Sequence, residues 1–117
     1  MTTDAAEAGF SYPSLVTDIR KAGLSITEIG QITGVRDRQV QNWVSGASRP
    51  SRDTRDRLVD VHYVVVQLLD VYRPEGVEIW LHSRNPELQG RRPIDVLIDG
   101  QFDPVLAAVE RLKSGAM

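Results

Sequence analysis

The segment from Ser25 to Ser45 constrains the fold most, because its ends and its middle all carry signals for short helices. Ser25-Ile26-Thr27-Glu28 is a capping-box pattern, in which a serine hydroxyl and a glutamate carboxylate satisfy free amides of a first helical turn. Gly34 ends this helix within two turns and permits a tight corner. A second helix is predicted from about Asp37 to Ser45, and Gly46 ends it. The segment therefore predicts two short helices joined at a corner.

Helix signals continue on both sides of this segment. A helix is expected to follow Pro13, because proline is tolerated in a first turn. The acidic and amide residues of segment 51–72 fall on one stripe of a helix, which favours a long helix over a buried strand. Further short helices are expected over Pro74–His82, over Pro93–Ile98 and from Pro104 onward. The fold class is therefore all-α, with an N-terminal helix-turn-helix bundle joined through a long helix to a small helical C-terminal domain.

Charge is distributed unevenly along the chain. The formal net charge is −2, but residues 36–57 hold six arginines against three aspartates. A basic segment between two acidic ones is typical of a local nucleic-acid contact. We predict a disordered N-terminus over 1–11, a helix-turn-helix DNA-binding domain over 12–57, and a helical domain for dimerisation and partner binding over 58–117.

The polar side of the second short helix carries side chains suited to DNA bases. Gln and Asn can pair with adenine and Arg with guanine, whereas arginines beyond the helix suit phosphates. Asp37 would repel phosphate, unless it simply caps the helix. The alternative reading is a solvated helix face with no role in DNA binding. The predicted DNA-contacting residues are Arg36, Arg38, Gln39, Gln41, Asn42, Arg49 and Arg52.

Apolar residues on the long helix recur at spacings of three and four, as in paired helices. They predict a homodimer, which would present two recognition helices to DNA half-sites about one turn apart. The same residues could also be the central core of the monomer, either without a dimer or alongside dimerisation. The predicted seam consists of Leu58, Val61, Val65, Leu68 and Tyr72.

Composition argues against several classes of protein. The chain has no cysteine and only two histidines, His62 and His82, so thiol chemistry and a metal site are not expected. No phosphate-binding loop or nucleophile motif is present, so we expect no catalytic residue, no cofactor and no small-molecule substrate. Charged residues interrupt Val59–Tyr72, and no signal peptide is visible. We expect a cytoplasmic protein with no membrane contact.

Two stretches carry a resemblance to known families. Leu24 to Gly30, Val40 to Gly46 and Arg49-Pro50-Ser51 resemble an Xre-type helix-turn-helix. Arg36 stands where that pattern usually has serine before the recognition helix. The tail resembles the C-terminal domain of the Xre/ParS/MbcA antitoxin family, and the two matches together cover nearly everything beyond the first dozen residues. The matching tail residues are Trp80-Leu81, Asn85, Leu88, Gly90, Arg91, Arg92, Pro93, Leu97, Gly100 and Val105.

This resemblance implies an all-helical, dimeric antitoxin that neutralises a RES-domain toxin, an enzyme that degrades cellular NAD. Such antitoxins cover the toxin's active-site cleft with their C-terminal domain and repress their operon through the helix-turn-helix on operator DNA. The alternatives are a stand-alone regulator without a toxin, and a protein-binding module that has lost DNA binding. Each toxin-contact candidate could instead have a structural or solvated role. The candidates are Trp80, Asn85, Arg91, Arg92, Arg111 and Lys113.

Overall fold

The computed structural model describes residues 11–115, and within them the chain forms helices joined by short turns. The predicted disordered N-terminus lies outside the described residues, except for Ser11. The Ser11 hydroxyl caps the first described helix by accepting a hydrogen bond from the Ser14 amide. The elements are α2 (Tyr12–Lys21), α3 (Ile26–Thr33), α4 (Asp37–Ser45), α5 (Arg52–Leu69), α6 (Pro74–His82), the 3-10 turn η1 (Pro86–Leu88), α7 (Pro93–Ile98) and α8 (Phe102–Gly115).

Local signals set the start of α3 and the ends of both short helices at the positions that the sequence predicts. The Ser25 hydroxyl accepts from the Glu28 amide at 3.0 Å, and the Glu28 carboxylate accepts from the Ser25 amide at 2.9 Å. Both bonds of the predicted capping box are therefore present. Gly34 and Gly46 follow α3 and α4 in the left-handed region, with φ of 80° and 82°.

The terminal helix begins earlier than predicted. We expected it to start at Pro104, but α8 begins at Phe102. Proline lacks an amide hydrogen, and the first turn of a helix leaves its amides without intrahelical partners, so Pro104 fits as the third residue of the helix.

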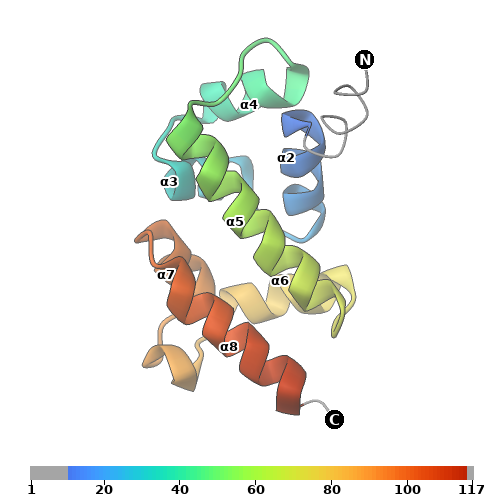
Figure 1. Ribbon diagram of the computed structural model, residues 1–117, viewed down its shortest axis with the longest axis vertical. Coiled ribbons are helices and arrows are strands. Elements are labelled where there is room, and N and C mark those ends of the chain that lie inside the picture. The colour runs from blue at the N-terminus through green and yellow to red at the C-terminus, as the bar shows by residue number, and fades with distance from the viewer. Residues whose placement is uncertain (1–10, 116–117) are drawn as a thin grey trace.

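Helix α5 runs through the middle of the molecule and belongs to both of its halves (Figure 1). Helices α2 and α3 pack against its first part, and α4 packs on α2 and α3. Helices α6 and α8 pack against α5 in the other half, where α7 packs on α6 and α8 and also contacts α3. One continuous cluster of buried residues includes side chains from both groups of helices. Within residues 11–115, no helix is long and apolar enough to cross a membrane. The described part is all-helical, as predicted, and α5 is its central element.

Candidate DNA-contacting and partner-contacting surfaces

The outer side of α4 carries the polar residues that the sequence predicts to contact DNA. Val40 and Trp43 are buried on its inner side, where α4 packs against α2 and α3. Within residues 11–115, none of the four candidate arginines forms an ion pair or a side-chain hydrogen bond, so their guanidinium groups are available to an anion. The candidates Arg36, Arg38, Gln39, Gln41, Arg49 and Arg52 are exposed, and Asn42 is partly buried.

The turn between α3 and α4 is packed so closely that only glycine fits at position 30. A Cβ atom on Gly30 would lie 2.6 Å from the backbone oxygen of Val35. The amides of Gly34 and Val35 donate to the Gly30 carbonyl at 2.7 and 2.9 Å. The Arg57 guanidinium donates to the Ile32 carbonyl at 3.3 Å, which ties α5 to the end of α3. These contacts hold α4 in one orientation relative to α3.

Asp37 does not cap α4, which was one of the two readings of this residue. Arg36 occupies the N-cap position and makes no side-chain capping bond. The Asp37 carboxylate instead accepts a hydrogen bond from the Thr27 hydroxyl on α3, at 2.8 Å. An exposed acid is therefore held at the start of the helix that carries the DNA-contact candidates.

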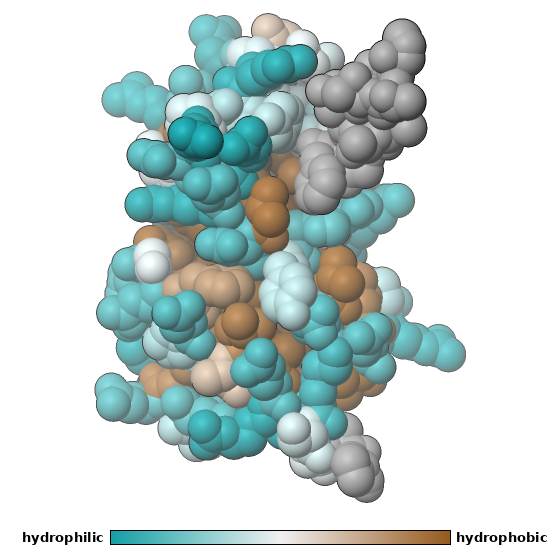
Figure 2. Space-filling model, viewed as in Figure 1, coloured by the Kyte–Doolittle hydropathy of each residue, from teal (hydrophilic) through white to brown (hydrophobic). Residues whose placement is uncertain are grey.

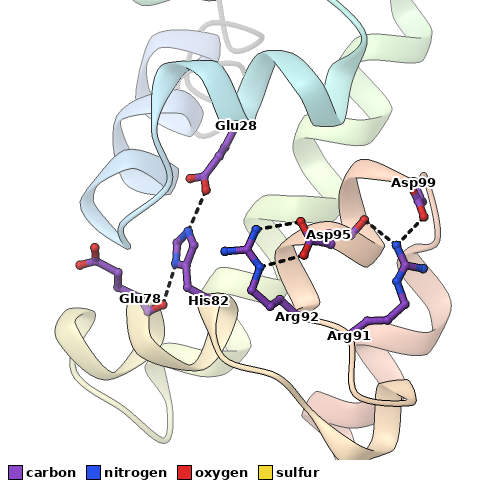
Figure 3. A network of polar contacts seen from close by, with 7 residues as sticks. All are labelled: Glu28, Glu78, His82, Arg91, Arg92, Asp95 and Asp99. Carbon is purple, nitrogen blue, oxygen red and sulfur yellow. Dashed lines mark hydrogen bonds and ion pairs between the residues drawn. The ribbon is translucent and has the colours of Figure 1, made fainter.

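A polar contact joins the two halves of the molecule (Figure 3). His82 Nε2 on α6 lies 2.8 Å from a carboxylate oxygen of Glu28 on α3, and His82 Nδ1 lies 2.8 Å from the Glu78 carbonyl. Partial burial lowers the pKa of His82, but its hydrogen bonds to Glu78 and Glu28 outweigh this, so the pKa is raised overall. Since both ring nitrogens face oxygens that only accept, the doubly protonated imidazolium satisfies both contacts. Glu28 thus serves both the capping box of α3 and the contact with α6.

The two adjacent arginines before α7 are paired within the chain (Figure 3). Arg91 donates to Asp99 at 2.5 Å, and Arg92 makes two bonds to Asp95 at 2.8 and 2.9 Å. The bonds from Arg92 lower the pKa of Asp95. Both pairs are exposed to solvent, so the guanidinium groups are accessible, although each already has an anionic partner.

The remaining partner-contact candidates are only partly brought together. The Asn85 side chain accepts from the Glu87 amide, and its backbone pairs with that of Arg91. Arg111 lies 3.4 Å from Glu87, so Asn85, Arg91 and Arg111 gather around η1. Lys113 instead contacts Gln67 and Asp70 at the end of α5. Trp80 is partly buried against the core. Through its bonds to Glu87 and Arg91, Asn85 stabilises the turn around η1, which is the structural role that the sequence allowed for it.

The residues predicted to form a dimer seam are mostly buried within the single chain. Four of them are buried, with 0 to 4% of each exposed, and Tyr72 also packs against the core. These side chains therefore form part of the core of the single chain, as the second interpretation of this helix predicts, and the homodimer stays a prediction. The four buried residues are Leu58, Val61, Val65 and Leu68.

The same helix has a second apolar side, which is exposed and was not predicted from the sequence. Tyr63, Val66 and Leu69 are 47, 41 and 43% exposed and recur every three residues on α5. Ile79 on α6 is 66% exposed. The wide apolar coverage of α5 was the signal that could have revealed this surface. Figure 2 shows apolar surface mainly over the half that holds α7 and α8, whereas the end that holds α4 is largely hydrophilic.

In the part of the chain that the structure describes, the acidic and histidine side chains form no group of three or more that is arranged to hold a metal ion. The second histidine, His62, contacts Asp18 on α2 at 3.2 Å.

Known proteins are similar to this chain in sequence and in fold. No protein-family model matches the chain. A probable mycobacterial cidal antitoxin of Mycobacterium tuberculosis is 34% identical over 102 residues, which cover 87% of each protein. The mycobacterial cidal antitoxin MbcA of Mycobacterium bovis is 32% identical over 97 residues, covering 83% of this chain and 86% of that protein.

A solved structure agrees with these relatives. A chain in the crystal structure of the M. tuberculosis MbcT-MbcA toxin-antitoxin complex superposes with a TM-score of 0.76 at 31% identity, covering 90% of this chain and 96% of the other. The MbcA part of the sequence resemblance is thereby confirmed, while the Xre and ParS labels stay a prediction. The chain belongs to the family of the mycobacterial cidal antitoxins, of which MbcA is a member.

Proposed function

We propose that this chain is the antitoxin of a type II toxin-antitoxin system and neutralises a RES-domain toxin that degrades NAD. The observation that supports this most is the likeness, along nearly the whole described chain, to relatives named antitoxins and to a chain of a toxin-antitoxin complex. On this proposal the chain acts in the cytoplasm as a binding protein, and the NAD chemistry belongs to the toxin.

We place the toxin contact on α6 and on the turns that follow it, where the antitoxin would cover the active-site cleft. Ile79 is an exposed apolar side chain beside the partly buried Trp80, and such residues anchor protein interfaces. The ion pairs of Arg91, Arg92 and Arg111 are solvent-exposed. Because exposed pairs are worth about 0–1 kcal/mol, a toxin carboxylate could replace the internal partner at little cost.

We propose that α3 and α4 form a helix-turn-helix that binds operator DNA and represses the operon. The support is the set of exposed, unpaired candidate arginines next to a rigid turn within the described residues. Arg38, Gln41 and Asn42 would face base edges, whereas Arg49 and Arg52 would contact phosphates. Steep weakening of DNA binding with salt is the expected signature.

We propose that the antitoxin dimerises through the exposed side of α5, with a second copy as the partner. Tyr63, Val66 and Leu69 provide an apolar face that water covers in the single chain. A two-fold axis there would give each DNA half-site its own α4. Val66→Glu is expected to yield a folded monomer, which analytical ultracentrifugation would detect.

Co-expression with the neighbouring reading frame, which on this proposal would encode the RES-domain toxin, tests the antitoxin proposal. The pair should co-purify, and the toxin's NAD consumption should stop when this chain is added. Ile79→Glu should restore NAD consumption, because it places a charge in the proposed contact. Val66→Glu, a matched charge on α5, should still inhibit. If Val66→Glu fails to inhibit the toxin while Ile79→Glu still inhibits it, the toxin contact has been assigned to the wrong surface.

Deleting α8 would not be a clean test of toxin binding. Val105 and Val109 on this helix are fully buried, so its removal would open the core. Failure of the intact chain to bind any RES-domain toxin, together with salt-dependent operator binding, would favour a stand-alone regulator. Toxin binding without any DNA binding would favour a purely protein-binding module.

A further inference from the structure

Asp37 is an acid at a position where DNA binding should disfavour one. It is exposed in the first turn of α4, between the exposed residues Arg36 and Arg38. Within residues 11–115 it forms no ion pair, and its side-chain bond is to the neutral hydroxyl of Thr27, at 2.8 Å. A carboxylate placed there costs affinity for every phosphate backbone, whatever the base sequence.

The Thr27 bond fixes one carboxylate oxygen and leaves the other free. Oδ2 accepts from the Thr27 hydroxyl, and within the described residues no donor reaches Oδ1. The bond joins two helices whose relative orientation is already set by the closely packed turn at Gly30. The free oxygen is therefore positioned at the end of α4 whose residues, in helix-turn-helix proteins, contact base edges.

A carboxylate discriminates among bases because it can only accept hydrogen bonds. In the major groove cytosine presents an amino donor, N4, whereas guanine presents the acceptors N7 and O6 and thymine the acceptor O4. Adenine offers an amino donor beside the acceptor N7, which an isolated carboxylate oxygen matches less well. A fixed carboxylate at this point favours cytosine and repels guanine and thymine.

We propose that Asp37, positioned by Thr27, is a specificity-determining residue that accepts a hydrogen bond from the amino group of a cytosine in the operator. This inference rests on the proposed DNA binding by α4 and adds a base preference to it. The loss of non-specific affinity and the gain of base choice come from the same group, so the residue lowers binding to other sequences while it selects its own.

The test is selection of binding sites from a pool of randomised duplexes with the full chain, purified with its toxin where the two co-purify. The variants are Asp37→Asn and, as a matched control, Asp53→Asn, which removes the same charge from an exposed position in the first turn of α5. Circular dichroism checks that each variant is folded.

The wild-type protein should select a cytosine at one fixed position in each half-site. Asp37→Asn should shift that position toward adenine, because an amide offers both a donor and an acceptor. The discrimination at that base pair should change about tenfold or more. Asp53→Asn should strengthen binding to all sequences alike. Thr27→Val should weaken the cytosine preference without removing any charge.

Two outcomes would overturn the inference, and they are distinguishable. If Asp37→Asn strengthens binding to all sequences by the same factor as Asp53→Asn and leaves the selected site unchanged, Asp37 only repels phosphate. In that case DNA binding by α4 stands and the base preference fails. If the wild-type protein enriches no site and shows no salt-dependent binding, the proposed DNA function itself fails, and the role of Asp37 fails with it.

Discussion

Replacing Glu28 with Gln should destabilise the protein at mildly acidic pH and have a much smaller effect at alkaline pH. The variant keeps a side-chain oxygen for the capping box, which accepts Gln as well as Glu. It loses the charge that faces His82 across the two halves, at 2.8 Å. The measured difference therefore reports the contact between α3 and α6 and not the cap.

The expected magnitude follows from the geometry and the exposure of the pair. Hydrogen bonds to charged groups contribute about 1.5–3 kcal/mol net when well buried. The side chains of His82 and Glu28 are 25 and 21% exposed, so solvent screening reduces this to about 1–2 kcal/mol.

The pH dependence follows from the raised pKa of His82. A histidine whose folded pKa lies above its unfolded value of 6.5 contributes stability that is fully present below that value. The contribution is lost as the pH rises through the folded pKa, because the imidazolium then loses a proton. The destabilisation caused by Glu28→Gln should therefore be largest at about pH 5.5 and small at about pH 8.5.

The assay is urea unfolding followed by circular dichroism at both pH values, with a double-mutant cycle of Glu28→Gln and His82→Gln. The matched control is the pair of His62 and Asp18, also a histidine beside a carboxylate, in which the Asp18 side chain is 54% exposed. Its cycle should give a smaller coupling free energy. Equal couplings at the two pH values, or none for Glu28 and His82, would refute the charged contact between the halves.

Three further changes test the packing and the charge pattern. Leu68→Ala should lower the free energy of unfolding by about 2–5 kcal/mol, whereas Leu69→Ala should change it by about 0.5 kcal/mol or less; equal losses in urea unfolding would contradict the assigned faces of α5. Gly30→Ala should lower the melting temperature through about 1–3 kcal/mol of strain against Val35, and an unchanged melting temperature would show that the turn can relax. Arg52→Ala should reduce the slope of log affinity for DNA against log salt by about one, and an unchanged slope would exclude a phosphate contact.

Helix ends were the most predictable part of this fold, because the signals that set them are local. The capping box at Ser25 and the glycines at positions 34 and 46 act through atoms a few residues apart. Helix α3 begins, and α3 and α4 end, where these signals predict. The start of α8 was misplaced for a related reason. Proline is tolerated throughout a first helical turn, so Pro104 marked the turn but not its first residue.

These local signals could not predict contacts between residues that are distant in the sequence. Glu28 was predicted as a capping residue, but its second contact is with His82, 54 positions away. The partners of Arg91 and Arg111 likewise depend on how α7, α8 and η1 pack. Many acidic residues in the sequence could pair with these cations. Which of them do so depends on how the helices pack.

The sequence by itself determined that the chain is helical, where most of the helices begin and end, and which antitoxin family it resembles. Only the tertiary structure decided which side of α5 is buried. Both sides carry apolar residues, so the pattern cannot rank them, and the packing of neighbouring helices covers Leu68 while leaving Leu69 in water. Periodicity is a property of one helix, whereas burial depends on what packs against it.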